Sequence, residues 1–268
     1  MAPSLLVRSW KEDCIYLVQF PRAGSAPTIS SYSLKMETWL RMAGLTYKNV
    51  NSEFKHKSEK GQVPFVELNG RQLCDTNFMI PELTRIFHVQ LDENLSEKER
   101  ADSVILESMI QDSLAWSALY FRSLDQSFLA TKEGIVGHFT GVKKYFLTMF
   151  LIPYLQRMFR QRCAAQGIGR QSPTEVLEVT NKKLKALSVF LGNKKYLVGD
   201  KVTSIDATAF GHLSMIYYCP MNKEVKRYME SDCRNLVNYL NKLKQEYWSD
   251  WDECTSKLSL DTKPIIKK

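Results

Sequence analysis

The segment Gly61–Ile80, GQVPFVELNGRQLCDTNFMI, constrains the fold more than any other part of the chain. Asn69 and Gly70 both tolerate a positive φ, so they predict a two-residue turn between two short strands. Pro64 leads into the first strand, and the side-chain oxygens of Asp75-Thr76-Asn77 favour a helix that starts directly after the second strand. A proline lacks its own ladder donor and a helix N-terminus offers unpaired N–H groups. Together these two features can hold a peptide-like anion.

Residues 1–90 alternate strands and helices. The sequence predicts an apolar strand at Cys14–Gln19, an amphipathic helix at Ser31–Ala43 and a second strand at Thr46–Val50. The hairpin and helix of Gly61–Ile80 follow. A strand–helix–strand unit followed by a hairpin and a helix is the order of a thioredoxin-like domain, with one right-handed parallel crossover.

After Asn94 the patterns are helical. Ser96 and Glu99 form a capping-box pair for a long helix that runs to about Gln126. Its expected apolar stripe is Ile105, Met109, Trp116 and Leu119, with Asp112 as the one carboxylate, either at the stripe edge, which is favoured, or facing a cleft between domains. Further helices are predicted at His138–Arg162, Thr174–Leu191, Thr203–Tyr217 and Asp232–Tyr247.

These patterns predict two domains and a tail. The fold class is an α/β N-terminal thioredoxin-like domain at residues 1–90, followed by an all-α C-terminal helical domain at residues 95–250. Residues 251–268 are expected to be a frayed tail. Within the helical part, Thr203 and Asp206 form a second capping-box pair, which we interpret as a folding nucleus without a catalytic role.

Charge and cysteine content limit the partners. A net charge of +8 favours an anionic partner such as an acidic metabolite, an anionic peptide or a membrane surface. The basic residues are spread and no basic–aromatic module is visible, so nucleic acid is not predicted as a partner. The six cysteines and four histidines have no metal-ligand spacing, so no metal is expected, and free thiols favour a reducing compartment.

The longest apolar run, Tyr145–Leu155, is too short to span a bilayer. Its flanking cations are Lys143, Lys144, Arg157, Arg160 and Arg162. They leave open a surface-lying amphipathic helix with peripheral membrane contact. A buried core helix is the favoured interpretation.

A family resemblance extends over about Tyr16 to Trp251. It rests on the segments QFPR, LKMETWLRMAGL, GQVPFVELNG, GIGR, NKKYLVGDKVTSIDATAFGHL and EYWSDW. With the two-domain layout, these segments resemble the failed axon connections (Fax) family, a branch of the glutathione transferase superfamily that is also similar to metaxins and to nematode cadmium-responsive proteins. The resemblance implies a cytoplasmic, mostly helical, glutathione transferase-like protein.

The resemblance also implies where a glutathione site lies. Family members tend to carry Ser-Pro-Phe-Cys at the start of the first helix, and this chain has Ser30-Ser31-Tyr32-Ser33, so the family cysteine is replaced by Ser33. Ser30 is the first candidate for holding a glutathione thiolate, followed by Ser31 and Tyr32. Plain capping of the helix by Ser30 or Ser31 is an equally supported and compatible interpretation.

Four further residues are expected to bind glutathione. Val63 and Pro64 are predicted to form a cis peptide that presents the Val63 backbone to the cysteinyl part of the ligand. Asp75 and Thr76 are predicted to hold its γ-glutamyl end at a helix N-terminus.

The resemblance and the candidate residues are compatible with two functions from different classes. The first is an enzyme that binds glutathione as a co-substrate and conjugates it to a hydrophobic small molecule, as in detoxification, through a serine-type site. The second is a non-catalytic glutathione transferase-like scaffold that acts through a second copy of the chain or another protein, in axon development or stress response.

Overall fold

The computed structural model describes residues 5–135 and 138–262. Strands β1 (Ile15–Gln19), β2 (Tyr47–Asn51), β3 (Phe65–Leu68) and β4 (Arg71–Cys74) form one sheet in the order β2–β1–β3–β4. β1 runs parallel to β2 and antiparallel to β3, and β3 pairs antiparallel with β4. The predicted parallel crossover followed by a hairpin is confirmed.

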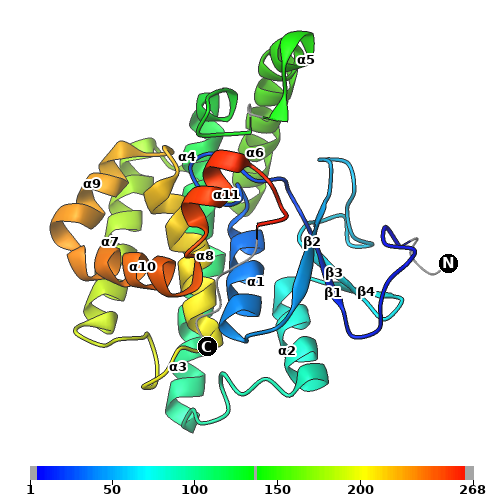
Figure 1. Ribbon diagram of the computed structural model, residues 1–268. Coiled ribbons are helices and arrows are strands. Elements are labelled where there is room, and N and C mark those ends of the chain that lie inside the picture. Colours follow the sequence, from blue (N-terminus) through cyan, green and yellow to red (C-terminus); the bar gives the residue numbers. More distant parts are fainter. Residues whose placement is uncertain (1–4, 136–137, 263–268) are drawn as a thin grey trace.

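Two helices complete the N-terminal domain. Helix α1 (Ser31–Met42) connects β1 and β2, and helix α2 (Thr76–Phe87) follows β4. α1 lies between the sheet and helix α8 (Ser204–Tyr218), as Figure 1 shows, and Trp39 at its centre is fully buried. α2 buries only Thr76, Met79, Ile80 and Leu83, which is the one-sided pattern of a helix that covers a sheet.

The described residues after Asn94 form the helical domain (Figure 1). A long rod is built from α3 (Glu97–Met109), the π-helical turn η1 (Ile110–Leu114) and α4 (Ala115–Leu124). The predicted Ser96–Glu99 capping box starts this rod. The other elements are η2 (Ser127–Ala130), α5 (Gly141–Phe146), η4 (Leu147–Leu151), α6 (Ile152–Gln166), η5 (Ile168–Arg170), α7 (Pro173–Leu191), α8, α9 (Lys223–Asp232), α10 (Arg234–Tyr247) and α11 (Trp251–Lys257).

The second predicted capping box is also present and does more than cap α8. Asp206 Oδ2 accepts from the backbone N–H of Thr203 at 2.9 Å, while Oδ1 accepts from the backbone N–H of Leu197 at 3.0 Å and from the hydroxyl of Tyr239 at 2.6 Å. Burial raises the pKa of the Asp206 carboxyl despite these bonds. The carboxylate therefore ties the start of α8 to α10 and to the preceding loop.

Two expectations about the helical part are wrong, and one helix was not predicted. Helix α9 was not predicted, because only Val225 and Met229 of its ten residues are buried and its apolar pattern is short. The tail is not frayed within the described residues: Trp251–Lys257 forms α11, in which Trp251 and Cys254 are buried. The long-rod stripe is shifted, because Ile105 is 66% exposed whereas Leu106, Ile110 and Leu114 are buried.

The apolar run Tyr145–Leu155 is not a buried core helix. Tyr145, Phe146 and Phe150 are 65%, 60% and 54% exposed. The run lies on a helical projection, α5–η4–α6, whose α5 end extends beyond the rest of the molecule in Figure 1. None of the helices in the described part of the chain is long and apolar enough to cross a bilayer.

Candidate functional site

The start of α1 carries the predicted catalytic residues. Ser30 is the N-cap, and its Oγ accepts from the backbone N–H of Ser33 at 3.2 Å. The capping interpretation of Ser30 is therefore confirmed. Because that oxygen accepts the capping bond, its own proton is free to be donated elsewhere. Ser31 is half-buried in the first turn, and the Tyr32 side chain is 39% exposed.

Ser33 stands at the position of the family cysteine. Its side chain is fully buried, and Oγ has no hydrogen-bond partner among the described residues. A buried hydroxyl without a partner costs free energy, on the order of 1–3 kcal/mol. The position therefore keeps a polar group but no thiol.

The predicted binding residues lie at β3 and at the start of α2. The Val63–Pro64 peptide is cis, as predicted, and Pro64 is buried beside the first residue of β3. Asp75 is the N-cap of α2, with φ of 74°, and its side chain accepts from the backbone N–H of Asn77 at 3.0 Å. Thr76 is 2% exposed, and its Oγ1 has no hydrogen-bond partner within residues 5–135 and 138–262. A buried hydroxyl thus stands at the N-terminus of α2, where Asp75 already accepts from the backbone N–H groups of Asn77, Phe78 and Met79.

A buried lysine joins the starts of α1 and α2. Lys35 Nζ donates to Asn77 Oδ1 at 3.0 Å, to Glu107 Oε1 at 2.8 Å and to Gln111 Oε1 at 3.1 Å. Burial lowers the pKa of this ammonium, and Glu107 opposes the change. Since Lys35 lies one turn after Ser31 and Asn77 follows Thr76 directly, the first turns of α1 and α2 are held close to each other and to the long rod.

Tyr32 lies against a buried histidine of α8. The rings of Tyr32 and His212 meet edge to face with centroids 4.8 Å apart. Burial raises the pKa of the Tyr32 phenol, and the charges of Asp112 and Asp75 raise it further, so the phenol keeps its proton. Burial lowers the pKa of His212 to about 3, with a smaller contribution from Lys35, so this imidazole is neutral near pH 7.

Asp112 proves to belong near this region. Its side chain is exposed, and its charge acts on the Tyr32 hydroxyl. An exposed carboxylate is what the favoured stripe-edge interpretation expects, and whether Asp112 faces a cleft between the domains stays a prediction.

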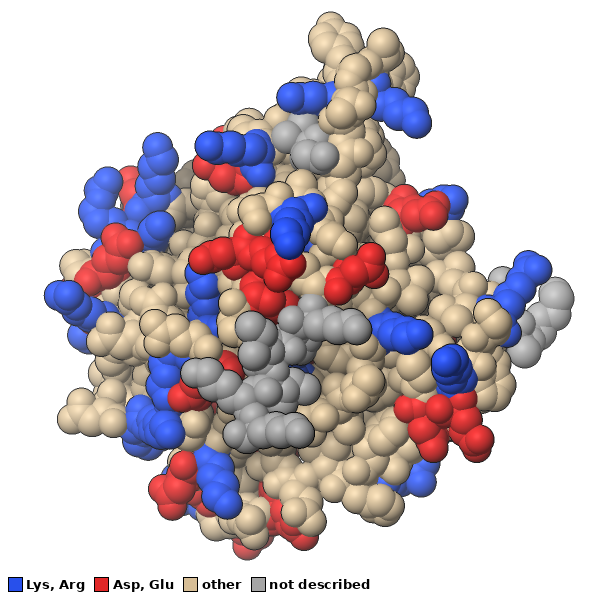
Figure 2. Space-filling view, in the orientation of Figure 1, with Lys and Arg blue, Asp and Glu red and all other residues tan. Residues whose placement is uncertain are grey.

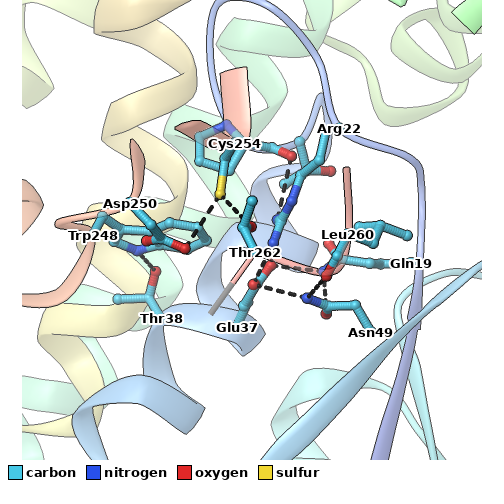
Figure 3. A network of polar contacts seen from close by, with 12 residues as sticks. Gln19, Arg22, Glu37, Thr38, Asn49, Trp248, Asp250, Cys254, Leu260 and Thr262 are labelled. Atoms are coloured by element: carbon cyan, nitrogen blue, oxygen red, sulfur yellow. Dashed lines mark hydrogen bonds and ion pairs between the residues drawn. The ribbon is translucent and has the colours of Figure 1, made fainter. Parts of the chain in front are cut away.

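α1 is fixed from its other side by a buried ionic network (Figure 3). Glu37 accepts two hydrogen bonds from the Arg22 guanidinium, both at 2.7 Å, and a third from Arg41 at 3.3 Å. Burial disfavours the charged carboxylate, but Arg22 and Arg41 hold the pKa of Glu37 well below its usual range. Further donors to this carboxylate are Gln19, Tyr47 and Asn49.

Sequence reasoning missed Lys35 and His212 as parts of this region. Lys35 stands in the LKMETWLRMAGL segment, where a charged residue within a helix buried on all sides is the one available signal. His212 was noted only as one of four scattered histidines. Its neighbours Tyr32 and Lys35 lie far away in the chain, so a single sequence gives no sign of the contact.

The arrangement has the parts needed to hold an anionic peptide with a thiol. Two helix N-termini meet, one with a hydroxyl free to donate and one with a buried, unpartnered hydroxyl, and both favour negative charge. Among the described residues there is no group of three or more His, Cys, Asp or Glu side chains arranged to hold a metal ion. All six cysteines are free, and none lies at the start of α1.

Comparisons with known protein families agree with this arrangement. The family model described as the glutathione S-transferase N-terminal domain matches residues 31–128, and the model described as the glutathione S-transferase C-terminal domain matches residues 180–243. A glutathione S-transferase of Ceriporiopsis subvermispora, solved in complex with glutathione, superposes with a TM-score of 0.58. The two are 15% identical, and the match covers 86% of this chain and 96% of that chain. The chain belongs to the glutathione transferase-like superfamily.

Individual relatives refine the assignment. Failed axon connections of Drosophila melanogaster is 34% identical over 94% of this chain, which spans 62% of that protein's length. The isoprene-epoxide–glutathione S-transferase of Rhodococcus sp. (strain AD45) is 28% identical over 84% of this chain and 95% of its own length. Metaxin-2 of Mus musculus is 23% identical over 90% of this chain and 91% of its own length. The predicted resemblance to the failed axon connections family, and through it to metaxins, is confirmed.

Proposed function

We propose that this protein binds glutathione between the starts of α1 and α2 and conjugates it to a hydrophobic electrophile through a serine-type site. The observation that carries the proposal is the buried Thr76 hydroxyl, which has no partner in the described part of the chain and stands at the N-terminus of α2. A relative that is 28% identical is named for the transfer of glutathione to an epoxide. That similarity supports the same class of reaction here.

In this proposal each residue has a separate task. The Thr76 hydroxyl, at the positive end of α2 and beside the Asp75 cap, holds the γ-glutamyl carboxylate, and Val63 offers its backbone to the cysteinyl part. The glutathione thiol releases its proton to solvent, Ser30 donates a hydrogen bond to the resulting thiolate, and the N-terminus of α1 further favours thiolate over thiol. Tyr32 remains protonated and is a second donor. The sulfur then forms a bond to the electrophilic carbon, the carbon–oxygen bond of an epoxide breaks, and the released oxygen takes a proton from solvent.

Calorimetry with glutathione tests the binding step. Thr76→Ala should weaken binding by at least about tenfold, because a hydrogen bond to a charged group contributes roughly 1.5–3 kcal/mol. Thr84→Ala is a matched control on the same helix, about two turns further along, and should bind like the parent. If the parent does not bind glutathione, or if Thr76→Ala binds it equally well, the proposed glutathione site between α1 and α2 is rejected.

A thiolate titration tests the serine separately. Thiolate absorbance of bound glutathione should follow a pKa below the free-thiol value of about 8.5 in the parent and near that value in Ser30→Ala. Turnover of an epoxide should fall by about 10²-fold in Ser30→Ala, the scale of removing one anion-stabilising donor. Thr84→Ala is again the control, because Thr84 lies about two turns from the start of α2 and outside the candidate site. Binding with equal titration curves and no turnover in either protein would reject the catalytic role and keep the binding site.

The second candidate function is a scaffold that acts through protein partners. It is favoured by the similarity to failed axon connections and metaxin-2 and by the absence of a thiol at the family cysteine position. In either role we place the protein in the cytoplasm, supported by six free cysteines, since reducing compartments keep thiols in that state. Glutathione binding without turnover, together with recovery of a defined partner, would support the scaffold.

A further inference from the structure

The helical projection α5–η4–α6 presents apolar side chains on its outer side. Val142 is 81% exposed and Tyr154 is 62% exposed. Four more large apolar residues are at least half exposed: Tyr145, Phe146, Met149 and Phe150. They recur at helical spacing, and the rings of Phe146 and Phe150 lie 4.4 Å apart. We call these six residues the apolar stripe.

The apolar stripe is not the side on which the projection packs. Leu151, Ile152 and Leu155 are half-buried and pack against the cluster that contains Phe128 and Leu129. The projection is therefore apolar on two sides, one facing the protein and one exposed. Monomeric proteins rarely expose contiguous apolar area of this kind unless something binds it.

The charge around the apolar stripe has a single sign. No Asp or Glu occurs between Glu133 and Glu175, whereas this interval contains Lys143, Lys144, Arg157, Arg160, Arg162 and Arg170. None of these six cations forms an ion pair with a described residue. In Figure 2 the upper projection is tan with blue Lys or Arg on both flanks. The surface therefore combines exposed aromatic side chains with unneutralised positive charge.

We propose that the projection is a membrane-docking element that inserts the apolar stripe into the interface of an anionic lipid bilayer. Phe and Tyr side chains are suited to the boundary between headgroups and acyl chains, and each nearby Lys or Arg gains from the negative surface potential. A second copy of the chain is the less suitable occupant, since it would bring the same cations against each other. The convex shape of the projection also suits insertion into a fluid surface. Docking here is independent of glutathione binding, because the stripe contains none of the residues of the α1–α2 site.

Sedimentation with lipid vesicles tests the proposal on the full chain. The protein should sediment with vesicles of phosphatidylcholine and phosphatidylserine in equal amounts, and much less with phosphatidylcholine alone. Binding should weaken as salt is raised, because salt screens surface charges. The variant Lys143→Gln with Lys144→Gln should bind about 30-fold more weakly, since each cation near the surface contributes about fivefold. The variant Phe146→Ser with Phe150→Ser should lose at least about tenfold.

Matched controls separate the projection from general charge and apolar exposure. Lys182→Gln with Lys223→Gln removes two exposed cations elsewhere, and Val104→Ser with Ile105→Ser removes two side chains that are 65% and 66% exposed on α3. Both controls should bind vesicles like the parent. Absence of vesicle binding in the parent, or equal binding by all four variants, overturns the proposal. A dimer in light scattering that Phe146→Ser with Phe150→Ser converts to a monomer, without lipid binding, overturns it in favour of a second copy.

Discussion

At the scale of single residues, three buried polar groups without partners lie in or beside the candidate site, among others elsewhere in the described chain. Ser33, Thr76 and His212 are each at most 2% exposed, and their side-chain polar atoms have no hydrogen-bond partner within the described residues. Such groups each cost free energy of folding. All three belong to the segments where α1, α2 and α8 meet, which is where a ligand could supply the missing bonds.

His212 makes a clear prediction for pH dependence. Its pKa is lowered to about 3 in the folded protein, whereas an unfolded histidine titrates near 6.5, so the unfolded chain binds the extra proton between these values. Stability is therefore complete above about pH 6.5 and is lost as the pH falls, by up to roughly 1.4 kcal/mol per pH unit. Urea unfolding at about pH 7 and about pH 5.5 measures this loss.

The variant His212→Gln should remove most of that loss between these two pH values, because glutamine does not titrate. His56→Gln is the control and should keep the pH dependence of the parent. If His212→Gln and the parent lose the same stability on acidification, another group is responsible.

At the scale of elements, the close crossing of α1 and α8 positions the site. A Cβ on Gly211 would lie 2.5 Å from the backbone nitrogen of Lys35 and 2.7 Å from the carbonyl oxygen of Ser31. Only a residue without a side chain allows this approach. Because Ser31 and Lys35 lie in the first turns of α1, packing against α8 fixes the position of the start of α1, where Ser30 is the N-cap.

Gly211→Ala should therefore affect both stability and the candidate site. The added methyl group meets backbone atoms that cannot rotate away, and we expect a loss of about 1–3 kcal/mol in the free energy of unfolding. Displacement of α1 should also weaken glutathione binding in the folded variant. Urea unfolding and calorimetry measure the two effects. An unchanged unfolding midpoint would mean that the helices separate without cost.

At the scale of the whole molecule, hydrogen bonds involving residues 248–260 join the helical domain to the N-terminal domain. Arg41 donates to both carboxylate oxygens of Asp250, at 2.5 and 3.0 Å, and its guanidinium lies 3.5 Å from the centre of the Trp248 ring. The Trp248 indole N–H donates to Thr38 Oγ1 at 2.9 Å, and Asn49 of β2 donates to the carbonyl oxygen of Leu260 (Figure 3). Arg41 donates to Glu37 as well as to Asp250, so it joins this segment to the buried ionic network around Glu37.

Asp250→Ala should be strongly destabilising. The side chains of Arg41 and Asp250 are each 2% exposed, so the change leaves a buried guanidinium with one carboxylate fewer, at a cost of about 3–5 kcal/mol. Asp252→Ala is the matched control two residues away, where the carboxylate is 96% exposed and should contribute less than about 1 kcal/mol. Equal unfolding midpoints for the two variants would show that the buried Arg41–Asp250 ion pair does not stabilise the contact between the domains.

Short-range chemistry determined much of this fold, and the sequence was sufficient to predict it. The Asn69-Gly70 turn, the Ser96 and Thr203 capping boxes and the order of strands and helices all depend on residues within a few positions of one another. The cis Val63–Pro64 bond and the caps at Ser30 and Asp75 were likewise predicted from local patterns and family segments. Local steric and hydrogen-bonding preferences act before any tertiary contact forms, which is why one sequence is enough to reveal them.

Only the tertiary structure decided which side chains are buried and what they meet. Lys35, His212 and Asp250 find their partners 42 to 209 positions away in the chain, and periodicity carries no information about such pairs. The tail became α11 because Trp251 and Cys254 have an apolar surface to bury against. The shifted rod stripe reflects which face of α3 the rest of the fold covers, since Leu106 is buried and the adjacent Ile105 is not. The run Tyr145–Leu155 is apolar in either environment. The outer side chains of this run are exposed because the α5 end of the projection extends beyond the rest of the molecule, where no other described element covers it (Figure 1).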